Sequence, residues 1–391
     1  MISTTAEGAR PLRVAFLGQA VGRRADGLTS YSEQVVGGLR RRGAEVYFHH
    51  ARGDGSQVPV DPAHAVAWPT LRFKTVTLPW PGFRPRMQGW LAAQRPDVTH
   101  CSLSFTLDDG WVAAAAERAG SARVATFHLP FGQAGTRRAL VMRELHRFWA
   151  RRLGHYQRVI VFTEEHRRRL AEVGVDLGRI EVLPNAVDTG RFCPGPSRVR
   201  AERLAGSSLV VGFAGRLDPE KGVRELLAGF VRARLGPDAR LLLAGRGALE
   251  SQVRQLAERD RRVVYLGQLT QLEDRIDFWR AVDIFCLPSS AEGLSISLLE
   301  AMASGCAVAV TPAGGLPVVA GGGVELDPSR LADAVAEQLQ ATSPGRAREL
   351  GASAREEAVR HHGVDGMLDR LLAIYGSCMN EQDHPGEWTP S

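Results

Sequence analysis

The feature that most constrains this 391-residue chain is an alternation of short apolar runs with helix-like stretches, which continues from end to end. Consecutive apolar residues are typical of strands that are buried on both faces. Strands that alternate with helices indicate parallel sheets covered by helices. The sequence therefore predicts an α/β protein. Because the length exceeds what one hydrophobic core normally supports, we expect more than one domain.

The alternation falls into two halves of similar size. Six strands are expected in the first half, at residues 12–18, 45–49, 97–101, 123–128, 158–163 and 180–184. A proline-flanked hairpin over 71–80 can add only an edge to that sheet. Five strands are expected in the second half, at 209–214, 240–244, 263–266, 283–287 and 307–311. Helices are expected to follow them, at 330–340, 346–360 and 364–375.

The pattern lapses between residues 185 and 208, where prolines and glycines indicate a linker. The predicted fold is two doubly wound, Rossmann-like domains whose parallel sheets face each other across a cleft, the usual ligand site of such sheets. We expect an N-terminal domain over 1–188, a C-terminal domain over 189–362, a helix over 363–378 that packs back on the first domain, and a disordered tail over 379–391.

The composition excludes several classes of protein. No run approaches the roughly 18 apolar residues of a membrane-spanning helix, and the start of the chain lacks the apolar core of a signal peptide, so we expect a cytoplasmic protein. Five scattered cysteines indicate neither disulfides nor a zinc site, and no cluster has metal-ligand spacing. A net charge of +6 permits attraction to phosphate-bearing partners but does not identify them, and no nucleic-acid-binding module is recognised in the sequence. The sequence does not fix the oligomeric state.

The turn after the expected strand 283–287 carries two carboxylates, Glu292 and Glu300, eight positions apart. A helix that begins near Ser295 points backbone N–H groups and the positive end of its dipole above that strand, which favours a diphosphate. An ionised carboxylate only accepts hydrogen bonds, so the glutamates suit sugar hydroxyls. A nucleotide sugar needs both kinds of contact. The alternative is a pair of solvated surface glutamates.

The first strand of the second half ends at Gly215, and the loop that follows carries Arg216 and Lys221 before a helix begins at Gly222. A guanidinium binds two phosphate oxygens at once, and an ammonium supplies a compact charge. Lys221 is one of only two lysines in the chain. This loop is therefore the candidate phosphate site, with a solvated loop as the alternative. The backbone after a similar turn at Gly267 could meet a nucleobase edge.

In the first half, two residues are candidates for the same cleft. Gly27 lies at the start of the first helix, where the lack of a side chain lets a phosphate approach backbone N–H groups. His128 ends the strand 123–128 and would face the cleft. A lone histidine is about as often a packed or surface residue, so both interpretations of His128 stay open.

Residues 136–154 combine six arginines with apolar residues at helical spacing. A core-facing helix with a solvated arginine face is the favoured interpretation. The alternative is peripheral contact with an anionic membrane, at the inner face of the cell membrane, which would suit a lipid acceptor.

Several motifs, found in this order, resemble the retaining glycosyltransferases of family 4, which have the two-domain GT-B fold. The first half contributes "RPDVTH" at 95–100 and "VATFH" at 124–128, and the linker contributes "RIEVLPNAVDTGRFCP" at 179–194. The most specific matches are "GRLDPEKG" at 215–222 and "LPSSAEGLSISLLEAMASGCAVAVT" at 287–311. The resemblance covers most of the chain.

The resemblance implies transfer of a hexosyl group from a nucleotide diphosphate sugar, with retained configuration and without a metal ion or other cofactor. Arg216 and Lys221 would bind the diphosphate and stabilise its charge as it leaves. Glu292 would contact the donor sugar, Glu300 the ribose hydroxyls, and His128 the sugar near the reaction centre. The leaving phosphate would help to deprotonate the acceptor, so no enzymatic nucleophile is required.

Backbone groups supply the remaining implied donor contacts, at Gly27, Gly215, Gly293, Leu294, Ser295 and Ile296. The chain departs from the family pattern at Asp26, Ala186, Ser295 and Ser297, and none of these changes removes a charge that the mechanism needs. We expect a UDP-sugar rather than a GDP-sugar, because such donors are common in the family. The acceptor stays open between a lipid, a polysaccharide precursor and a secondary metabolite.

Three other functions compete with this one. A non-catalytic sugar-nucleotide binding protein of the same fold would be expected to have lost one of the four charged residues Arg216, Lys221, Glu292 and Glu300, and all are present. A nucleic-acid-binding protein would need aromatic residues interleaved with a basic patch. A sugar-nucleotide epimerase would not be expected to pair "GRLDPEKG" with "EGLSISLLE".

Overall fold

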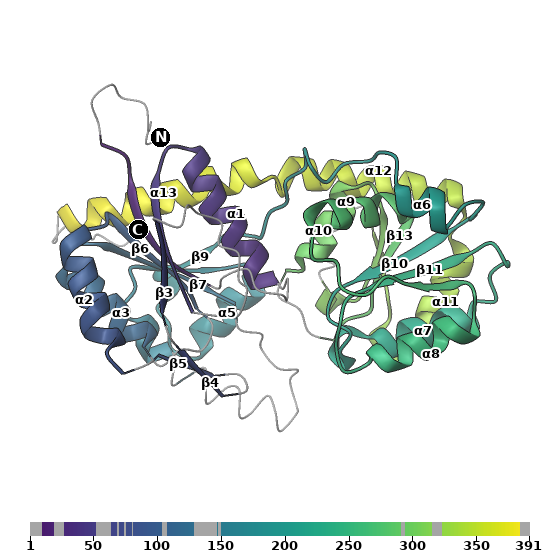
Figure 1. The fold of residues 1–391 in the computed structure, drawn as a ribbon, viewed down its shortest axis with the longest axis horizontal. Helices are drawn as coiled ribbons and strands as arrows, with labels where there is room; N and C mark the ends of the chain where they lie inside the picture. The colour runs from purple at the N-terminus through teal and green to yellow at the C-terminus, as the bar shows by residue number, and fades with distance from the viewer. Residues whose placement is uncertain are drawn as a thin grey trace. The chain divides into compact units, whose positions relative to one another are not determined.

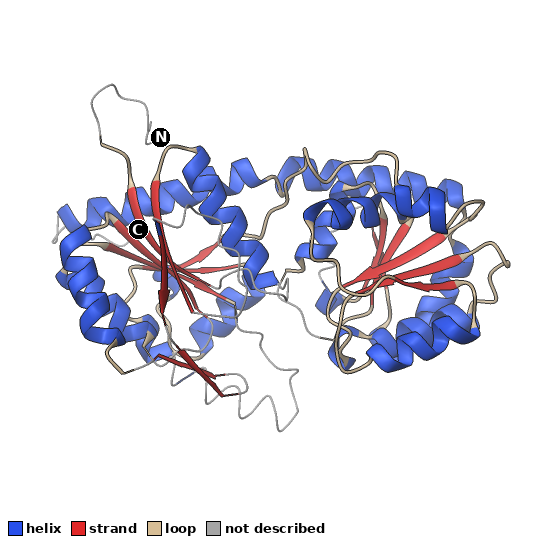
Figure 2. Cartoon of the chain, viewed as in Figure 1, coloured by secondary structure: helices blue, strands red, loops and turns tan. Residues whose placement is uncertain are grey.

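The structure is a computed structural model, and it describes residues 10–18, 27–51, 64–68, 70–73, 76–79, 81–103, 108–128, 147, 150–290, 294–314 and 323–383. The chain forms two compact units, each with strands at its centre and helices around them (Figure 1, Figure 2). The first unit comprises Met1–Pro184 and Asp365–Ser391, and the second comprises Asn185–Val364.

Seven described strands form the main sheet of the first unit, in the order β3 (Ala65–Trp68), β2 (Glu45–Ala51), β1 (Arg13–Gly18), β6 (Val98–Leu103), β7 (Ala122–Phe127), β8 (Arg158–Val161) and β9 (Ile180–Val182). All neighbouring strands are parallel. The strand order reverses between β1 and β6. Such a reversal is the point at which open α/β sheets bind ligands.

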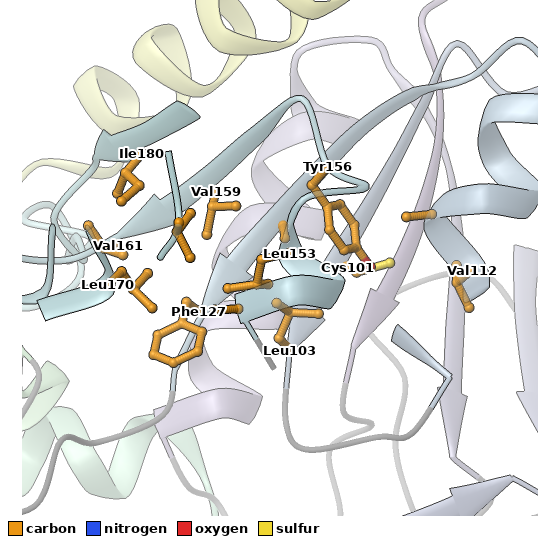
Figure 3. Close-up of a cluster of buried hydrophobic side chains, with 14 residues drawn as sticks. Cys101, Leu103, Val112, Phe127, Leu153, Tyr156, Val159, Val161, Leu170 and Ile180 are labelled. Carbon is orange, nitrogen blue, oxygen red and sulfur yellow. The ribbon is translucent and has the colours of Figure 1, made fainter. Parts of the chain in front are cut away.

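The strands of the first unit coincide with runs of apolar residues because both faces of the sheet are covered. Every residue of β6 is buried. On one face, Phe127, Leu153 and Tyr156 pack in a single cluster (Figure 3), which Leu170 joins from a helix. Burial of one such side chain contributes about 2 kcal/mol to stability.

The described helices of the first unit are α1 (Gly27–Arg41), α2 (Phe83–Gln94), α3 (Asp109–Arg118), α5 (Glu164–Glu172), the short 3-10 helix η2 (Leu177–Arg179) and α13 (Val364–Asp383). Helix α13 comes from the far end of the sequence (Figure 1). A Cβ at Gly38 of α1 would overlap the side chain of Leu368 in α13. Arg42 pairs with Asp365 and Asp369 of the same helix. Helix α13 therefore packs on α1.

The hairpin expected over 71–80 forms outside the main sheet. Strands β4 (Thr70–Phe73) and β5 (Val76–Pro79) pair antiparallel in a sheet of their own. The edge of the main sheet is instead formed by β3, which the sequence pattern did not indicate. This strand is only four residues long and none of its residues is fully buried, so its apolar signal is weak.

Six described strands form the sheet of the second unit, in the order β12 (Val263–Tyr265), β11 (Arg240–Ala244), β10 (Val210–Ala214), β13 (Ile284–Leu287), β14 (Ala307–Val310) and β15 (Gly323–Glu325). All are parallel, and the order reverses between β10 and β13. The described α-helices are α6 (Arg198–Arg203), α7 (Val223–Arg232), α8 (Glu250–Arg259), α9 (Leu272–Ala281), α10 (Ile296–Ala303), α11 (Leu331–Ala341) and α12 (Pro344–His361). The 3-10 helices are η3 (Pro219–Lys221), η4 (Pro312–Gly314) and η6 (Pro328–Arg330).

Every strand expected from the sequence is present, with ends that differ by at most two residues. The predicted two-domain α/β fold with parallel sheets is confirmed. The stretch 185–208, however, is not a free linker. It belongs to the second unit and contains α6, which Ser197 caps and which Asp277 of α9 binds through the backbone N–H groups of Arg198 and Val199.

The chain passes between the units after residue 184 and again after residue 364, a few residues from the expected positions 188 and 362. The two connecting segments pair within the second unit, where Val187 forms an isolated parallel bridge with Gly363. Helix α13 continues to Asp383, so the predicted boundary at residue 379 between this helix and a disordered tail is wrong. The side chain of Arg158 pairs with Glu381 and helps to hold this last turn. Residues 384–391 lie outside the described residues.

Candidate functional site

Two loops leave the sheet of the second unit at its point of reversal, from the carboxyl ends of β10 and β13. The loop after β10 spans 215–222, contains η3 and carries Arg216 and Lys221. The loop after β13 spans 288–295 and leads into α10. The topology therefore brings the two most specific sequence motifs to the place where a ligand is expected.

These two loops are bonded to each other. The backbone carbonyl of Glu220 accepts hydrogen bonds from Ser290 N at 2.9 Å, from Ser289 Oγ at 3.0 Å and from Ser290 Oγ at 3.2 Å. A Cβ at Gly222 would overlap the carbonyl oxygen of Pro288, and the φ of 69° at Gly222 also favours glycine. The loop with the candidate cations therefore has a fixed position on the loop after β13.

The guanidinium of Arg216 is held by two carboxylates of its own loop. It pairs with Asp218, and its Nη2 donates to Glu220 at 2.9 Å. The other oxygen of Asp218 accepts from the backbone N–H of Ala248, at 3.0 Å, in the loop after β11. The Arg216 side chain is still 55% exposed. It can therefore exchange these partners for phosphate oxygens, which a guanidinium binds in pairs.

The turns after β11 and β12 continue this series of hydrogen-bonded strand-end turns. Gly245 N donates to Gly267 O at 2.7 Å, and the Tyr265 hydroxyl donates to Gly245 O at 2.6 Å. A Cβ at Gly245 would overlap the carbonyl oxygen of Gly215. Four neighbouring strand-end turns of this unit thus support one another mainly through backbone contacts.

Helix α10 begins at Ile296, where the sequence predicts it. Its N-cap is Ser295, whose side chain accepts from Leu298 N at 3.4 Å. The side-chain amide of Asn185 donates to Leu294 O at 2.8 Å and fixes the chain just before the helix. The helix N-terminus at the point of reversal favours an anion.

Several candidate residues lie outside the described residues, namely Glu292, Gly293 and Asp26, together with most of the basic stretch 136–154. Their roles stay predictions. Gly27 is the first residue of α1, which follows β1 at the point of reversal of the first sheet. In the basic stretch, residues 150–153 are helical.

Glu300 lies in the interior of the second unit, where its side chain is 4% exposed. Its carboxylate accepts from the guanidinium of Arg275 and from the indole N–H of Trp279, both on α9. The alternative of a solvated glutamate is therefore wrong for Glu300. Its contact with a ribose stays a prediction.

His128 directly follows β7, at the carboxyl end of the strand beside β6. Its ring centroid lies 4.8 Å from that of Tyr31 and 5.1 Å from that of Phe162. Its Nε2 forms a hydrogen bond of 2.9 Å with Ser102 Oγ. Burial lowers the pKa of His128 to about 3, because an imidazolium would lose its hydration there. At neutral pH the ring can hydrogen-bond a hydroxyl but supplies no positive charge.

A buried polar network contacts His128 through the Tyr31 ring. His100 of β6 bonds to the Tyr375 hydroxyl through Nδ1 at 2.5 Å and to Thr126 Oγ1 through Nε2 at 2.7 Å. The Tyr31 hydroxyl bonds to the same Thr126 oxygen at 2.8 Å. Burial lowers the pKa of His100 to about 3 as well. The network connects α13 with α1, whose Tyr31 also contacts the His128 ring.

Four side chains that shape this site have no role in the sequence-based interpretation, namely Asn185, Asp218, Ser289 and Ser290. Asp218 lies between the two candidate cations, and Asn185 lies in the motif "PNAVD". Position within a motif was the only available signal, because Asn185, Ser289 and Ser290 bind atoms that are distant in sequence, and so does one oxygen of Asp218.

Among the residues that the structure describes, no three His, Cys, Asp or Glu side chains gather closely enough to hold a metal ion. In the same part of the chain, no helix combines the length and the apolar composition needed to cross a bilayer.

Comparison with models of known families shows the family to which the chain belongs. Residues 25–191 match the model of Glycosyltransferase Family 4, and residues 208–341 match that of Glycosyl transferases group 1. The GDP-mannose-dependent alpha-(1-6)-phosphatidylinositol monomannoside mannosyltransferase of Mycobacterium tuberculosis is 30% identical over 383 residues, which cover 91% of each protein. The chain belongs to glycosyltransferase family 4.

Two further similarities concern a relative and a solved structure. The alpha-maltose-1-phosphate synthase of Mycolicibacterium smegmatis is 31% identical to this family 4 glycosyltransferase over 228 residues, which is 51% of this chain and only 57% of that protein. Sucrose-phosphate synthase from Thermosynechococcus elongatus has the same fold, with a TM-score of 0.76 over 94% of this chain and 99% of that one, at 20% identity. The expected family and the expected transferase class are confirmed.

Proposed function

We propose that this family 4 glycosyltransferase moves a hexosyl group from a nucleotide diphosphate sugar to an acceptor hydroxyl, with retention of configuration. The observation that carries the proposal is the bonded pair of loops in the second unit. Arg216 and Lys221 lie on one loop, and the N-terminus of α10 follows the other. Cations beside a helix N-terminus form a suitable diphosphate site.

The chemistry depends on charge stabilisation, because the leaving group departs as a diphosphate anion. Asp218 and Glu220 hold Arg216 in place until phosphate oxygens replace them. A preorganised group of this kind typically contributes about 10²–10³-fold to the rate. Neutral His128 is proposed to hydrogen-bond the donor sugar. The leaving phosphate is proposed to take the acceptor proton, so that no nucleophile, metal ion or other cofactor from the protein is needed.

A GDP-sugar is the donor that the full-length relative supports. That relative is GDP-mannose-dependent by name and is similar over 91% of this chain. The sequence-based preference for a UDP-sugar rests only on how common such donors are in the family, and this relative does not support it. We therefore propose GDP-mannose as the first donor to test, with UDP-glucose as its competitor.

The acceptor is proposed to be a phosphate-bearing polyol or sugar. The relatives are named for phosphatidylinositol monomannoside and for alpha-maltose-1-phosphate, and each of these carries phosphate. A net charge of +6 suits an anionic acceptor. If that acceptor is a lipid, the arginines of 136–154 would bring the protein to an anionic membrane surface. Co-sedimentation with anionic but not zwitterionic vesicles tests this, and no binding to either contradicts it.

A donor screen tests the function. Purified protein is incubated with GDP-mannose, UDP-glucose and UDP-N-acetylglucosamine, and the release of nucleoside diphosphate is measured. We expect one donor to be cleaved by the wild type and by Arg224→Ala, which removes an exposed cation of α7, but not by Lys221→Ala or Glu292→Ala. Failure to bind any donor contradicts the proposal. Binding without cleavage or transfer favours the alternative of a non-catalytic binding protein.

A further inference from the structure

The carboxylate of Glu300 has each of its two oxygens bound by a side chain of α9. Oε2 accepts from Trp279 Nε1 at 2.9 Å, and Oε1 accepts from Arg275 Nη2. Glu300 is 3% exposed and Trp279 is 1% exposed, while the side chain of Arg275 keeps 19% of its surface. A charge removed from water needs such partners. Arg275 supplies the opposite charge to this carboxylate.

These two bonds leave acceptor capacity on Glu300. An ionised carboxylate offers about four lone-pair sites, and among the residues that the structure describes, the two side chains of α9 use two of them. The remaining two match the number of hydroxyl donors on a ribose. A carboxylate held from one side by two donors presents its free lone pairs in a fixed direction.

The partners of Glu300 are themselves fixed. The Trp279 ring packs edge-on against Phe285, with centroids 5.1 Å apart and an interplanar angle of 84°. The thiol of Cys306 donates to the Trp279 carbonyl at 3.4 Å. The guanidinium carbon of Arg275 lies 5.7 Å from the centroid of the Phe192 ring. The buried Trp279 indole therefore cannot turn away from Glu300 without disturbing the core of the unit.

Helix α9 also follows the segment for which a nucleobase contact is expected. It begins at Leu272, a few residues after the turn at Gly267, and Arg275 lies in its first turn. Gly267 is bonded to the row of strand-end turns that carries Arg216. One helix therefore joins the expected base-contacting loop to the carboxylate expected to bind ribose.

We propose that Arg275 and Trp279 are positioning residues that hold the Glu300 carboxylate oriented to accept the ribose hydroxyls of the donor nucleotide. This inference rests on the proposed function, because it requires a nucleotide donor.

Calorimetric titration of the whole protein tests the inference, with GDP, UDP and their 2′,3′-dideoxy analogues as probes. We expect the wild type to bind one ribonucleotide about tenfold to a hundredfold more tightly than its dideoxy analogue, the range for hydrogen bonds to a charged group. This preference is expected to fall to within about twofold in Arg275→Met and Glu300→Gln. Arg275→Lys, which keeps the charge, should restore part of it.

Two further variants make the test specific. Trp279→Phe keeps an aromatic ring but lacks the N–H, so the preference should fall while the protein still folds, even if Arg275→Met does not fold. Arg280→Met is the matched control, because Arg280 lies on the same helix and donates to the Cys193 carbonyl at 3.0 Å instead. It should keep the full preference for the ribonucleotide.

The outcomes separate this inference from the proposed function. If the wild type binds a nucleotide but does not prefer it over the dideoxy form, the inference is overturned and the proposed function stands. The same holds if Arg275→Met and Trp279→Phe unfold at lower urea concentrations yet keep the preference, because the two residues would then only support the fold. If none of the four probes binds the wild type, both proposals are overturned.

Discussion

The two units hold their candidate residues by different means. In the second unit the strand-end turns contact one another mainly through backbone atoms, as where the Glu220 carbonyl binds the loop after β13 and Gly245 lies against Gly215. In the first unit His128 is held by side chains, with Ser102 bonded to its ring and Tyr31 packed against it. A site held by backbone contacts tolerates most side-chain substitutions, except at a glycine where an added Cβ would overlap the neighbouring turn. A site built from side chains depends on a few hydroxyls and on pH.

The largest loss of stability is expected where a substitution adds a Cβ atom at the contact between two turns of the second unit. Gly245→Ala would place a methyl group on the Gly215 carbonyl at a φ of 134°, and should cost about 4 kcal/mol from backbone strain and overpacking together. Gly267→Ala has a φ of 76° with no described atom within 4 Å, and should cost about 1 kcal/mol. Urea unfolding compares the two. Equal midpoints would show that close contact between the turns does not support the site.

Removal of a candidate cation should affect the reaction and leave the fold intact. Lys221→Ala is expected to lower kcat by about 10²–10³-fold, which corresponds to about 3–4 kcal/mol of charge stabilisation in the transition state. Its free energy of unfolding should stay within about 0.5 kcal/mol of that of the wild type, as for most surface substitutions. Arg224→Ala is the matched control. A Lys221→Ala enzyme with wild-type kcat would contradict the assignment of this loop.

Acid should destabilise the first unit more than the second. The pKa values of the fully buried His49 and His100 are lowered to about 3 by burial, whereas both titrate near 6.5 when unfolded. The unfolded state therefore binds more protons between these values, and stability is lost as the pH falls below about 6.5. Each histidine should cost about 1 kcal/mol between pH 6.5 and 5.5.

The second unit provides the internal reference for this experiment. Burial also lowers the pKa of its His362, but the nearby Glu357 opposes that shift. Hydrogen exchange measured peptide by peptide, and corrected for its intrinsic pH dependence, should show the earlier loss of protection in strands of the first unit. Equal losses in both units would contradict the prediction.

The smallest effect is expected from loss of the hydrogen bond between Ser102 and His128. Ser102→Ala removes the hydroxyl bonded to His128 Nε2 and should lower kcat/KM by about fivefold, the equivalent of about 1 kcal/mol for one neutral hydrogen bond. Ser121→Ala removes a similar buried bond, 2.8 Å to Thr99, before the amino end of β7. Both variants should lose similar stability, but only the first should lose activity. An equal loss of activity in both would indicate a general effect of destabilisation.

The sequence predicts the strands and helices of this protein well, because short apolar runs that alternate with helix-like stretches are typical of parallel strands buried between helices. It also places Arg216, Lys221 and the start of α10 at strand ends. It does not reveal which loops bond to each other, since the Glu220 carbonyl and Ser290 are 70 positions apart. The surroundings of Glu300 were missed for a related reason. Every residue of α10 except Ser297 is buried, so a glutamate there needs partners from another helix.

The path of the chain also sets the order in which the protein can be completed on the ribosome. The second unit is one continuous segment, whereas the first consists of its N-terminal part and the helix α13 at the far end. Until α13 has emerged, His100 lacks the hydroxyl of Tyr375, and Gly38 lacks its contact with Leu368. Domains usually mature in the order of their synthesis. Here the unit whose synthesis begins first cannot be completed until α13 has been translated, whereas the second unit is complete in sequence at Val364.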